Sequence, residues 1–458
     1  MTSQPASEDL QLDGDVVLPD HAGYDEARRV FNMLHDRRPA VIVRCASEQD
    51  VVAALAHARE RGLAVCVRSG GHSAPGFSMI DDALVIDVRG LESVAIDAAA
   101  QVARVGAGLT WGELDAATQE HGLAVTGGRV TSTGVSGLTL GSGSGWLERV
   151  MGLTPDNVLA MRVVTADGRV VVASADENPD LYWALRGGGG NFGVVTEFTF
   201  RLMKVGPIVR GGMRVYPFPR AAEILRTYAQ IMSEAPDELC GGLALLSAPP
   251  APFVPPEAVG KPVVAVIALW AGAPQDADAG VAPLEALGEP IADLIGDIPY
   301  TAVQQLLDEG NPYGVQREHQ TSGFLQELDE ESIATFVDAA AGFLSPLTVL
   351  VLQPMGGAYG RVAEGETALG QRDAKWAYQV LSQWTDPADD EANRVWTRAL
   401  QAALQRRADA ASFPNFVSDT TPGVLRTAYA PATLERLQDA KRTWDPENVF
   451  CHNHRLLD

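Results

Sequence analysis

The sequence predicts an α+β protein in which the two ends of the chain build one domain around an inserted second domain. In the first part of the chain, strand and helix patterns alternate with dense glycine loops. The middle part carries amphipathic helices and strands without such loops, and the last part returns to short, turn-rich motifs. We expect the boundaries at 1–207, 208–410 and 411–458, with the first and third segments forming one domain.

Charge and cysteine usage limit the class of protein. The 458 residues carry a formal net charge of −24, from 35 Lys and Arg against 59 Asp and Glu, so we expect neither a nucleic-acid nor an anionic-membrane face. The four cysteines are far apart and predict no zinc site and no disulfide framework: Cys45, Cys66, Cys240 and Cys451. Without a signal-peptide pattern or a membrane-length apolar run, a cytoplasmic protein is expected.

The first predicted elements lead into a glycine loop. Residues 40–45 and 64–67 have strand patterns, and the helix expected over 47–61 begins with a capping box of Ser47 and Asp50. The second strand is followed directly by Arg68, Ser69, Gly70, Gly71, His72 and Ser73.

Two glycines before a lone imidazole favour an anion site. Glycine has no Cβ and tolerates positive φ, so consecutive backbone N–H groups can converge on a phosphate, and Arg68 would add a fixed positive charge. His72 would then lie beside the group that carries the phosphates. The alternative is a glycine-rich surface turn with a solvated histidine.

A second glycine run occupies 127–145, after a strand over 83–88 and a helix that Thr110 and Glu113 open as a capping box. A helix is not expected in this run, because each glycine costs nearly 1 kcal/mol, about the largest penalty after proline. We interpret the run as extended backbone near a ligand, with the N–H groups and hydroxyls available to it. A flexible linker is the alternative, which the interleaved apolar residues disfavour.

A hairpin and a third glycine run follow. Strands over 158–165 and 170–173 flank an Asp-Gly turn, and a short helix then ends in four glycines before a strand over 194–200. The spacing Gly188-x-Gly190-x-x-Gly193 matches a dinucleotide fingerprint. We reject that match, because the fingerprint requires the glycines to follow a strand and open a helix.

The middle segment predicts a domain that covers a cofactor site and shapes a substrate pocket. Helices are expected over 221–235, 332–343 and 389–408, and strands over 242–247, 262–270 and 347–353, with the proline-rich 248–256 as a hairpin excursion or lid. The last segment contains Ser-Phe-Pro-Asn-Phe at 412–416 and a helix over 431–444.

These motifs together resemble the berberine-bridge-enzyme-like branch of the vanillyl-alcohol-oxidase, or p-cresol methylhydroxylase, superfamily of FAD enzymes. The likeness covers nearly the whole chain. It is carried by R-S-G-G-H-S at 68–73, L-Y-W-A-L-R-G-G-G-G-N-F-G at 181–193, and W-D-P-E-N-V-F at 444–450 with Asn453. The resemblance implies a bipartite FAD-binding domain around an inserted antiparallel sheet domain, and a covalent bond from His72 to the flavin 8α-methyl group.

Two departures from the family pattern have consequences. Many relatives carry a second, cysteinyl flavin bond, but Val130 stands at that position, so a single attachment through His72 is expected. Relatives with a tyrosine base have it two residues before the asparagine that corresponds to Asn415. Phe413 stands there instead and cannot accept a proton, so the base must come from elsewhere or the substrate must need little help.

The resemblance also suggests site residues. His319 is the best available general base, with a solvated loop histidine as the alternative, and Gln353 is expected to hydrogen-bond the substrate, with a strand-end surface glutamine as the alternative. Asn415 and Asn453 are expected near the isoalloxazine or its ribityl chain, and Asn415 is also expected to take part in catalysis. The other expected FAD contacts are Arg68, Ser69, Gly70, Gly71, Ser73, Thr131, Thr133, Gly134, Gly137, Leu138, Gly143 and Val195. Thr133 and Leu138 also match an oxygen pocket in relatives that form a flavin N5-oxide.

The expected activity is an FAD-dependent oxidase that takes a hydride from a C–H next to oxygen or nitrogen in a hydrophobic or aromatic small molecule. O2 would reoxidise the flavin and give H2O2, and a role in natural-product tailoring fits. The alternatives are an oxygenase that uses an oxygenated flavin, a dehydrogenase with another acceptor, and a flavin-carrying binding protein without turnover. A monomer or homodimer is expected, with no bound metal.

Overall fold

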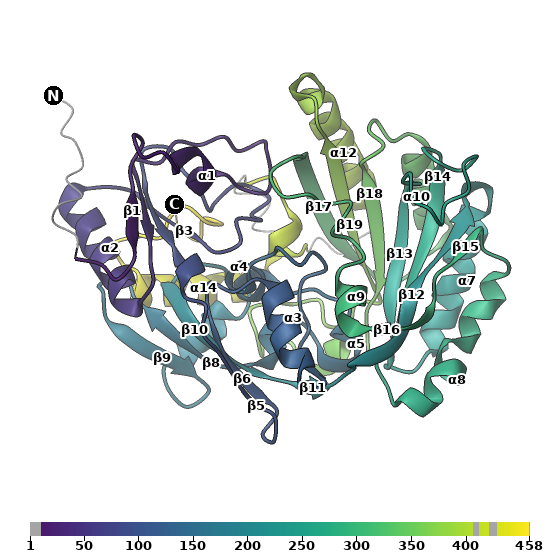
Figure 1. Cartoon of the computed structure of the whole chain (residues 1–458), viewed down its shortest axis with the longest axis horizontal. Helices are drawn as coiled ribbons and strands as arrows, with labels where there is room; N and C mark the ends of the chain where they lie inside the picture. The colour runs from purple at the N-terminus through teal and green to yellow at the C-terminus, as the bar shows by residue number, and fades with distance from the viewer. Residues whose placement is uncertain (1–10, 406–411, 421–427, 458) are drawn as a thin grey trace.

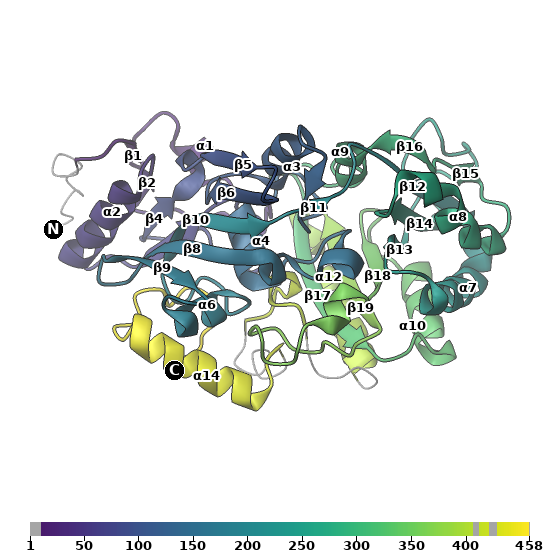
Figure 2. The ribbon, with the colours of Figure 1, turned by 90° about the horizontal axis from the view of Figure 1, so that it is seen from below.

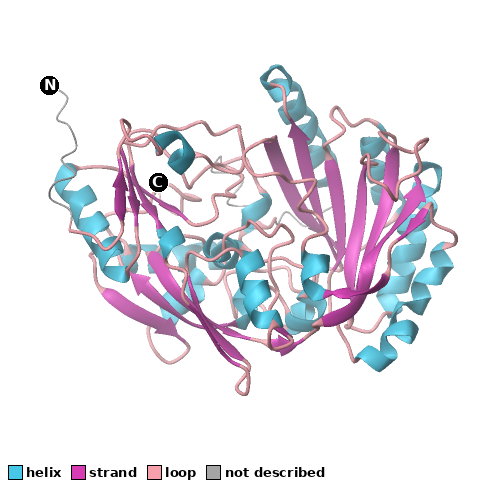
Figure 3. Ribbon diagram, viewed as in Figure 1, coloured by secondary structure: helices cyan, strands magenta, loops and turns pink. Residues whose placement is uncertain are grey.

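The computed structural model describes residues 11–405, 412–420 and 428–457 (Figure 1). Its described strands form a four-stranded and a five-stranded sheet in the first part of the chain, a two-stranded pair, and one large sheet in the middle of the chain. Helices lie between and outside these sheets (Figure 3). This mixed α+β architecture is the predicted fold class. Within the described residues, no helix is both long and apolar enough to cross a membrane.

The first sheet has the strand order β1-β2-β4-β3. Its strands are β1 (Asp15–Val17), β2 (Val41–Arg44), β3 (Val65–Arg68) and β4 (Leu84–Asp87). Both β2 and β3 pair in parallel with β4, so β4 lies between them. The connecting helix α2 (Glu48–Arg61) has the expected capping box of Ser47 and Asp50, and left-handed Gly62 ends it.

The second sheet is antiparallel in the order β5-β6-β10-β8-β9. Its strands are β5 (Val94–Asp97), β6 (Val102–Gly106), β8 (Val158–Val164), β9 (Val170–Ser174) and β10 (Val194–Arg201). The predicted hairpin is confirmed as β8 and β9, with Gly168 at φ +84° in its turn. The four glycines precede β10, as the rejection of the dinucleotide fingerprint requires.

The helices of this region include α1 (Tyr24–Arg28), α3 (Trp111–Gln119), α5 (Glu148–Met151) and α6 (Pro179–Leu185). The predicted capping box of Thr110 and Glu113 opens α3. A two-stranded pair, β7 (Leu123–Ala124) and β11 (Met203–Lys204), lies near the exit to the middle segment.

The prediction that the second glycine run contains no helix is wrong. Helix α4 (Val135–Gly141) lies inside it, with Gly134 as its N-terminal cap. Leu138 and Leu140 are buried in the largest hydrophobic cluster, and the Val135 N–H donates to the Leu109 carbonyl. Burial of the apolar side chains outweighs the low helix propensity of glycine, since packing supplies most of the stability of short helices in proteins.

The middle segment forms an eight-stranded antiparallel sheet in the order β15-β12-β14-β13-β18-β19-β17, with β16 also pairing β12. Its strands are β12 (Ile208–Pro217), β13 (Leu239–Ser247), β14 (Pro262–Trp270), β15 (Ala292–Asp293), β16 (Gly296–Pro299), β17 (Arg317–Leu325), β18 (Val349–Pro354) and β19 (Trp376–Trp384).

Helices cover one face of this sheet over a second hydrophobic cluster, and the other face is turned toward the glycine loops (Figure 1). The covering helices are α7 (Ala221–Glu234), α8 (Ala277–Val281), α10 (Glu330–Ala341) and α12 (Asp390–Gln405). Helix α9 (Tyr300–Gln304) lies against α3 instead, and α11 (Ala358–Arg361) lies against α5. The predicted end of α12, 406–408, lies outside the described residues.

The C-terminal helix α14 spans Pro431–Trp444, as predicted, and packs beside α6 (Figure 2). Lys441 at its end is buried and donates to the backbone carbonyls of Asn191 and Phe450 and to the Asp445 carboxylate at 2.6 Å. The C-terminal segment therefore holds the third glycine run in place. The domain boundaries expected after residues 207 and 410 remain a prediction.

Candidate active site

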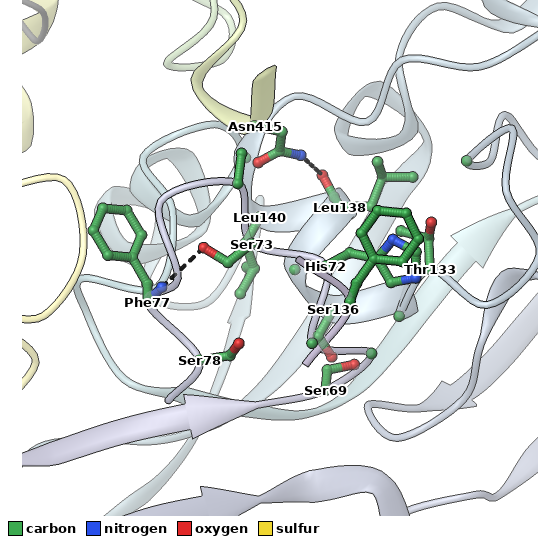
Figure 4. Close-up of a pocket in the computed structure, with 18 of the residues that line it drawn as sticks. Ser69, His72, Ser73, Phe77, Ser78, Thr133, Ser136, Leu138, Leu140 and Asn415 are labelled. Carbon is green, nitrogen blue, oxygen red and sulfur yellow. Dashed lines mark hydrogen bonds between the residues drawn. The ribbon is translucent and has the colours of Figure 1, made fainter. Parts of the chain in front are cut away.

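A cavity lies between the glycine loops and the open face of the large sheet. Residues 69–75, 77 and 78 and parts of 128–144 line one side of it (Figure 4). Parts of 189–195 line the same side. The other side is lined by Glu318 and Gln320 of β17, Val351 of β18, and Gln379 and Leu381 of β19. Asn415 and Asn453, from the C-terminal segment, complete the lining.

The two glycine loops meet through backbone alone. A Cβ on Gly70 would lie 2.1 Å from the Gly134 nitrogen, and one on Gly134 would lie 2.2 Å from the Gly70 nitrogen. Gly71 has φ +73°, where a side chain is strained. At Gly137, by contrast, a Cβ would meet no atom within 4 Å, so this residue borders open space in the cavity.

The loop 69–75, which lines this space, carries several backbone N–H groups without a partner among the described residues. Within the described residues, the N–H groups of Gly70, Gly71, His72 and Ser73 have no hydrogen-bond acceptor. Gly71 is buried and the other three residues are partly buried. Because backbone N–H groups that are shielded from water are nearly always paired, a ligand rich in acceptors would suit this loop. The pyrophosphate of a dinucleotide such as FAD would fit this requirement.

His72 is held as a neutral imidazole. Its ring stacks on Phe31 with the centroids 4.1 Å apart, meets the edge of Tyr313, and bonds through Nε2 to the Ser132 hydroxyl at 2.9 Å. Burial lowers the pKa of His72 to about 3. A neutral imidazole retains a nucleophilic nitrogen, and the ring has little freedom to turn away from the cavity.

Two asparagines join the C-terminal segment to the loops. The Asn415 amide donates to the Leu138 carbonyl at 3.0 Å (Figure 4). The Asn453 amide donates to the Gly190 carbonyl at 3.0 Å. Gly141 leaves the room that Asn415 fills, because a Cβ there would lie 1.7 Å from its Oδ1. These residues fix the shape of the loop side.

Most of the predicted FAD contacts line the cavity: Ser69, Gly70, Gly71, His72, Ser73, Thr133, Gly134, Gly137, Leu138, Val195, Asn415 and Asn453. Three do not. The Arg68 guanidinium points away and donates to the carbonyls of Ala27 and Arg29, so it supplies no charge to a phosphate. Thr131 donates its backbone N–H and its hydroxyl to the Asp308 carboxylate, and Gly143 lies against Thr154.

The expected base His319 does not face the cavity. Side chains alternate along a strand, so Glu318 and Gln320 line the cavity whereas His319 between them points to the opposite face. There its ring is near Asp419 and Arg398, and burial lowers its pKa to about 4. This placement gives His319 no access to a substrate in the cavity.

Gln353 is fully buried behind the lining. With its amide turned so that the oxygen faces Arg129, it accepts from that guanidinium at 2.8 Å. Arg129 also pairs with Glu148 at 3.2 Å and lies over the Trp146 ring. Gln353 therefore supports Arg129, a lining residue, and does not itself reach the cavity.

The sheet side contains residues that the sequence analysis missed: Glu318, Gln320 and Gln379. The sequence offers no clear signal for them, because β17 is polar at successive positions from Arg317 to Ser322 and so does not show which face is turned to the cavity. Phe413 is buried against Phe324, and Val130 lines the cavity, so neither supplies a base or a thiol. Within the described residues, no group of His, Cys, Asp and Glu could hold a metal ion.

Two family descriptions match the chain. Residues 39–174 match "FAD binding domain" and residues 412–455 match "Berberine and berberine like". Both matches fall on segments that line the loop side of the cavity.

Individual relatives agree with these matches. The (R)-6-hydroxynicotine oxidase of Paenarthrobacter nicotinovorans is 32% identical, over 98% of this chain and 97% of its own. The FAD-dependent monooxygenase tpcD of Cochliobolus heterostrophus is 30% identical, over 91% of this chain and 83% of its own. Among solved structures, 6-hydroxy-D-nicotine oxidase from Arthrobacter nicotinovorans superposes with a TM-score of 0.86 at 28% identity, covering 98% of both chains.

The fold, the cavity and the matched families define an FAD-linked oxidoreductase, a flavoprotein enzyme that acts on small molecules. Within this class, the chain belongs to the berberine-bridge-enzyme-like branch of the vanillyl-alcohol-oxidase, or p-cresol methylhydroxylase, superfamily.

Proposed function

We propose that this protein is an oxidase whose FAD is bonded covalently to His72 and to no second residue. The observation that carries the proposal is the placement of His72, whose neutral imidazole lines the cavity beside the loop with unpartnered N–H groups. The bound flavin would accept a hydride from a substrate C–H next to oxygen or nitrogen and pass the electrons to O2, which gives H2O2.

In this proposal, the residues of this chain bind the cofactor, orient it and shield the reaction from water. The N–H groups of 70–73 would hold the pyrophosphate, with Asn415 and Asn453 keeping the surrounding loops in place. Val351 and Leu381 give the sheet side an apolar surface that suits a hydrophobic or aromatic substrate and excludes water. A tether through His72 would prevent loss of the cofactor between turnovers.

The test is to denature the purified yellow protein in acid and to screen it for peroxide release. The colour should stay with the precipitate in the native protein and move to the supernatant in His72→Ala. Amines, alcohols and aromatic polyketides, the substrate classes of natural-product tailoring, form the screen. Yellow supernatant from the native protein would refute the tether, and flavin bleaching without peroxide would refute the oxidase.

A flavin-dependent oxygenase is the second candidate, because one relative is named a monooxygenase and Thr133 and Leu138 line the cavity. Labelled O2 separates the two: an oxidase leaves the label in peroxide, whereas an oxygenase transfers it to the product. A dehydrogenase with another acceptor would reoxidise slowly in air.

We further propose that the segments 1–207 and 411–458 act as the FAD domain and 208–410 as the substrate domain. The cavity supports this division, since its loop side and sheet side come from these segments. The four free cysteines, three of them buried, suit a reducing cytoplasm, and a monomer or homodimer remains our proposal for the assembly.

A further inference from the structure

The sheet side of the cavity holds a carboxyl group that has no cationic partner among the described residues. Glu318 is 2% exposed and lines the cavity. Its two oxygens accept from neutral amides, one from Gln320 and one from Gln383, the latter at 2.7 Å. No Arg, Lys or His of the described residues forms an ion pair with it, and burial raises its pKa. A buried carboxylate without a counter-charge is costly, so a cationic ligand in the cavity would stabilise the charged form of this group.

A second acceptor lies next to the first. The Gln320 side chain is 8% exposed, and its Oε1 is buried without a hydrogen-bond partner among the described residues. Its Nε2 already donates a hydrogen bond to the Glu318 carboxyl. Gln320 and Glu318 stand two residues apart on β17 and therefore on the same, cavity-lining face. Buried polar atoms are nearly always satisfied, so a ligand with more than one N–H donor fits this corner.

The charges around the rest of the cavity do not compete for such a ligand. Glu318 is the one carboxyl group among the described residues that line it. Arg129 is already paired with Glu148, and burial lowers the pKa of both His72 and His454, which keeps these two rings neutral. The sheet side therefore combines the apolar Val351 and Leu381 with one acidic group, Glu318, and the acceptor of Gln320.

We propose that Glu318 and Gln320 bind a basic nitrogen of the substrate, so that the enzyme selects amines over neutral alcohols of the same shape. This inference rests on the proposed function and names its substrate class. The ammonium group would donate one N–H to the Glu318 carboxylate and another to Gln320 Oε1. Glu318 would also take up the proton that the nitrogen must lose: one N–H bond breaks, one O–H bond forms, and the nitrogen keeps the electron pair that helps its neighbouring carbon release a hydride.

The experiment compares pairs of probes in the flavin-loaded protein. Arylalkyl amines, beginning with benzylamine, are each matched with the alcohol of the same skeleton, and anaerobic titration follows the flavin absorbance as a binding signal. A charge-assisted contact predicts amines bound roughly ten- to a hundred-fold more tightly than the alcohols. Glu318→Gln, which keeps the shape of the side chain, should reduce that preference to less than about three-fold.

Two further variants make the test specific. Asp390→Asn removes a carboxylate that pairs with Arg317 on the other face of β17, and the amine preference should survive it. Gln320→Leu leaves the Glu318 carboxyl in place and should weaken amine binding about three- to ten-fold. This variant still tests the proposal if Glu318→Gln does not fold.

Equal binding of amines and alcohols by the native protein, a preference that persists in Glu318→Gln, or no binding of any amine would overturn the inference. These outcomes are distinct from failure of the proposed function. Suppose that the acid precipitate is yellow and that the protein releases peroxide from alcohols but does not bind amines. The oxidase assignment would then stand, and the proposed amine selectivity would be refuted.

Discussion

The two sides of the cavity are built by different means. On the loop side, backbone N–H groups and closely packed glycines form the surface, and Gly70 and Gly134 approach each other where no side chain fits. On the sheet side, the side chains of β17, β18 and β19 form it, with Glu318 as its carboxyl group. A surface made of backbone suits a constant cofactor, whereas a surface made of side chains can change with the substrate without disturbing the fold.

The largest expected effect on stability comes from a variant that removes a buried ion pair supporting the loop side. Lys441→Met removes one partner of the buried Lys441–Asp445 pair, both less than 2% exposed, and leaves a buried carboxylate uncompensated. Such losses cost roughly 3–5 kcal/mol. Thermal unfolding should show a markedly lower Tm and less bound flavin. The control is Arg442→Met, one residue on, whose exposed pair with Asp439 should be worth less than about 0.5 kcal/mol; equal effects of the two variants would contradict the account.

The next effect concerns the junction between the two regions. Asp115 of α3 accepts from Gln304 of α9 at 2.9 Å, and burial raises its pKa to about 7. A folded-state pKa above the unfolded value of about 4 means that stability is full below pH 4 and falls as the pH rises toward 7. Asp115→Asn should therefore be more stable than the native protein at pH 8, by roughly 2–4 kcal/mol, and not at pH 4. Tm profiles across this range test the prediction, and parallel profiles would rule it out.

A single methyl group should distinguish two glycines of the loop side. In Gly134→Ala the Cβ collides with the backbone of Gly70, which costs roughly 1–3 kcal/mol in overpacking. In Gly137→Ala the Cβ enters open space, so the fold should keep its Tm while flavin incorporation falls. Tm and the flavin-to-protein absorbance ratio measure both. Similar Tm losses in the two variants would show that Gly137 does not border the cofactor space.

The smallest effect on stability is expected from the sheet side. Gln379→Leu replaces a cavity-lining amide with an apolar side chain of similar size and should change Tm by less than the equivalent of about 1 kcal/mol. Flavin content should stay unchanged while KM shifts for substrates found in the screen. A loss of flavin as large as that of Gly134→Ala would mean that the two sides are not separable in this way.

The same contrast explains what the sequence could predict. Glycines mark close backbone approach whatever surrounds them, so the loop side was located at 68–73 and 127–145. Capping boxes located α2 and α3, because their side chains bond within a few residues. The orientation of Arg68 was not predictable, because its guanidinium bonds carbonyls about forty residues away, at Ala27 and Arg29.

The sheet side escaped prediction for a physical reason. Strand β17 turns polar side chains toward a cavity, so it lacks the apolar alternation by which half-buried strands are found. The family resemblance points to His319 by its position in the chain, whereas the carboxyl that faces the cavity belongs to its neighbour Glu318. A shift of one residue along a strand reverses the face, and only the register against β19 settles it.

The central claim is the bond between His72 and the flavin. Intact-mass spectrometry of the native protein, followed by digestion, tests it most directly. The account predicts a mass increased by one FAD, an increment confined to the peptide that contains His72, and its complete loss in His72→Ala. A native protein with the mass of the bare polypeptide, or an increment on a peptide without His72, would contradict the account.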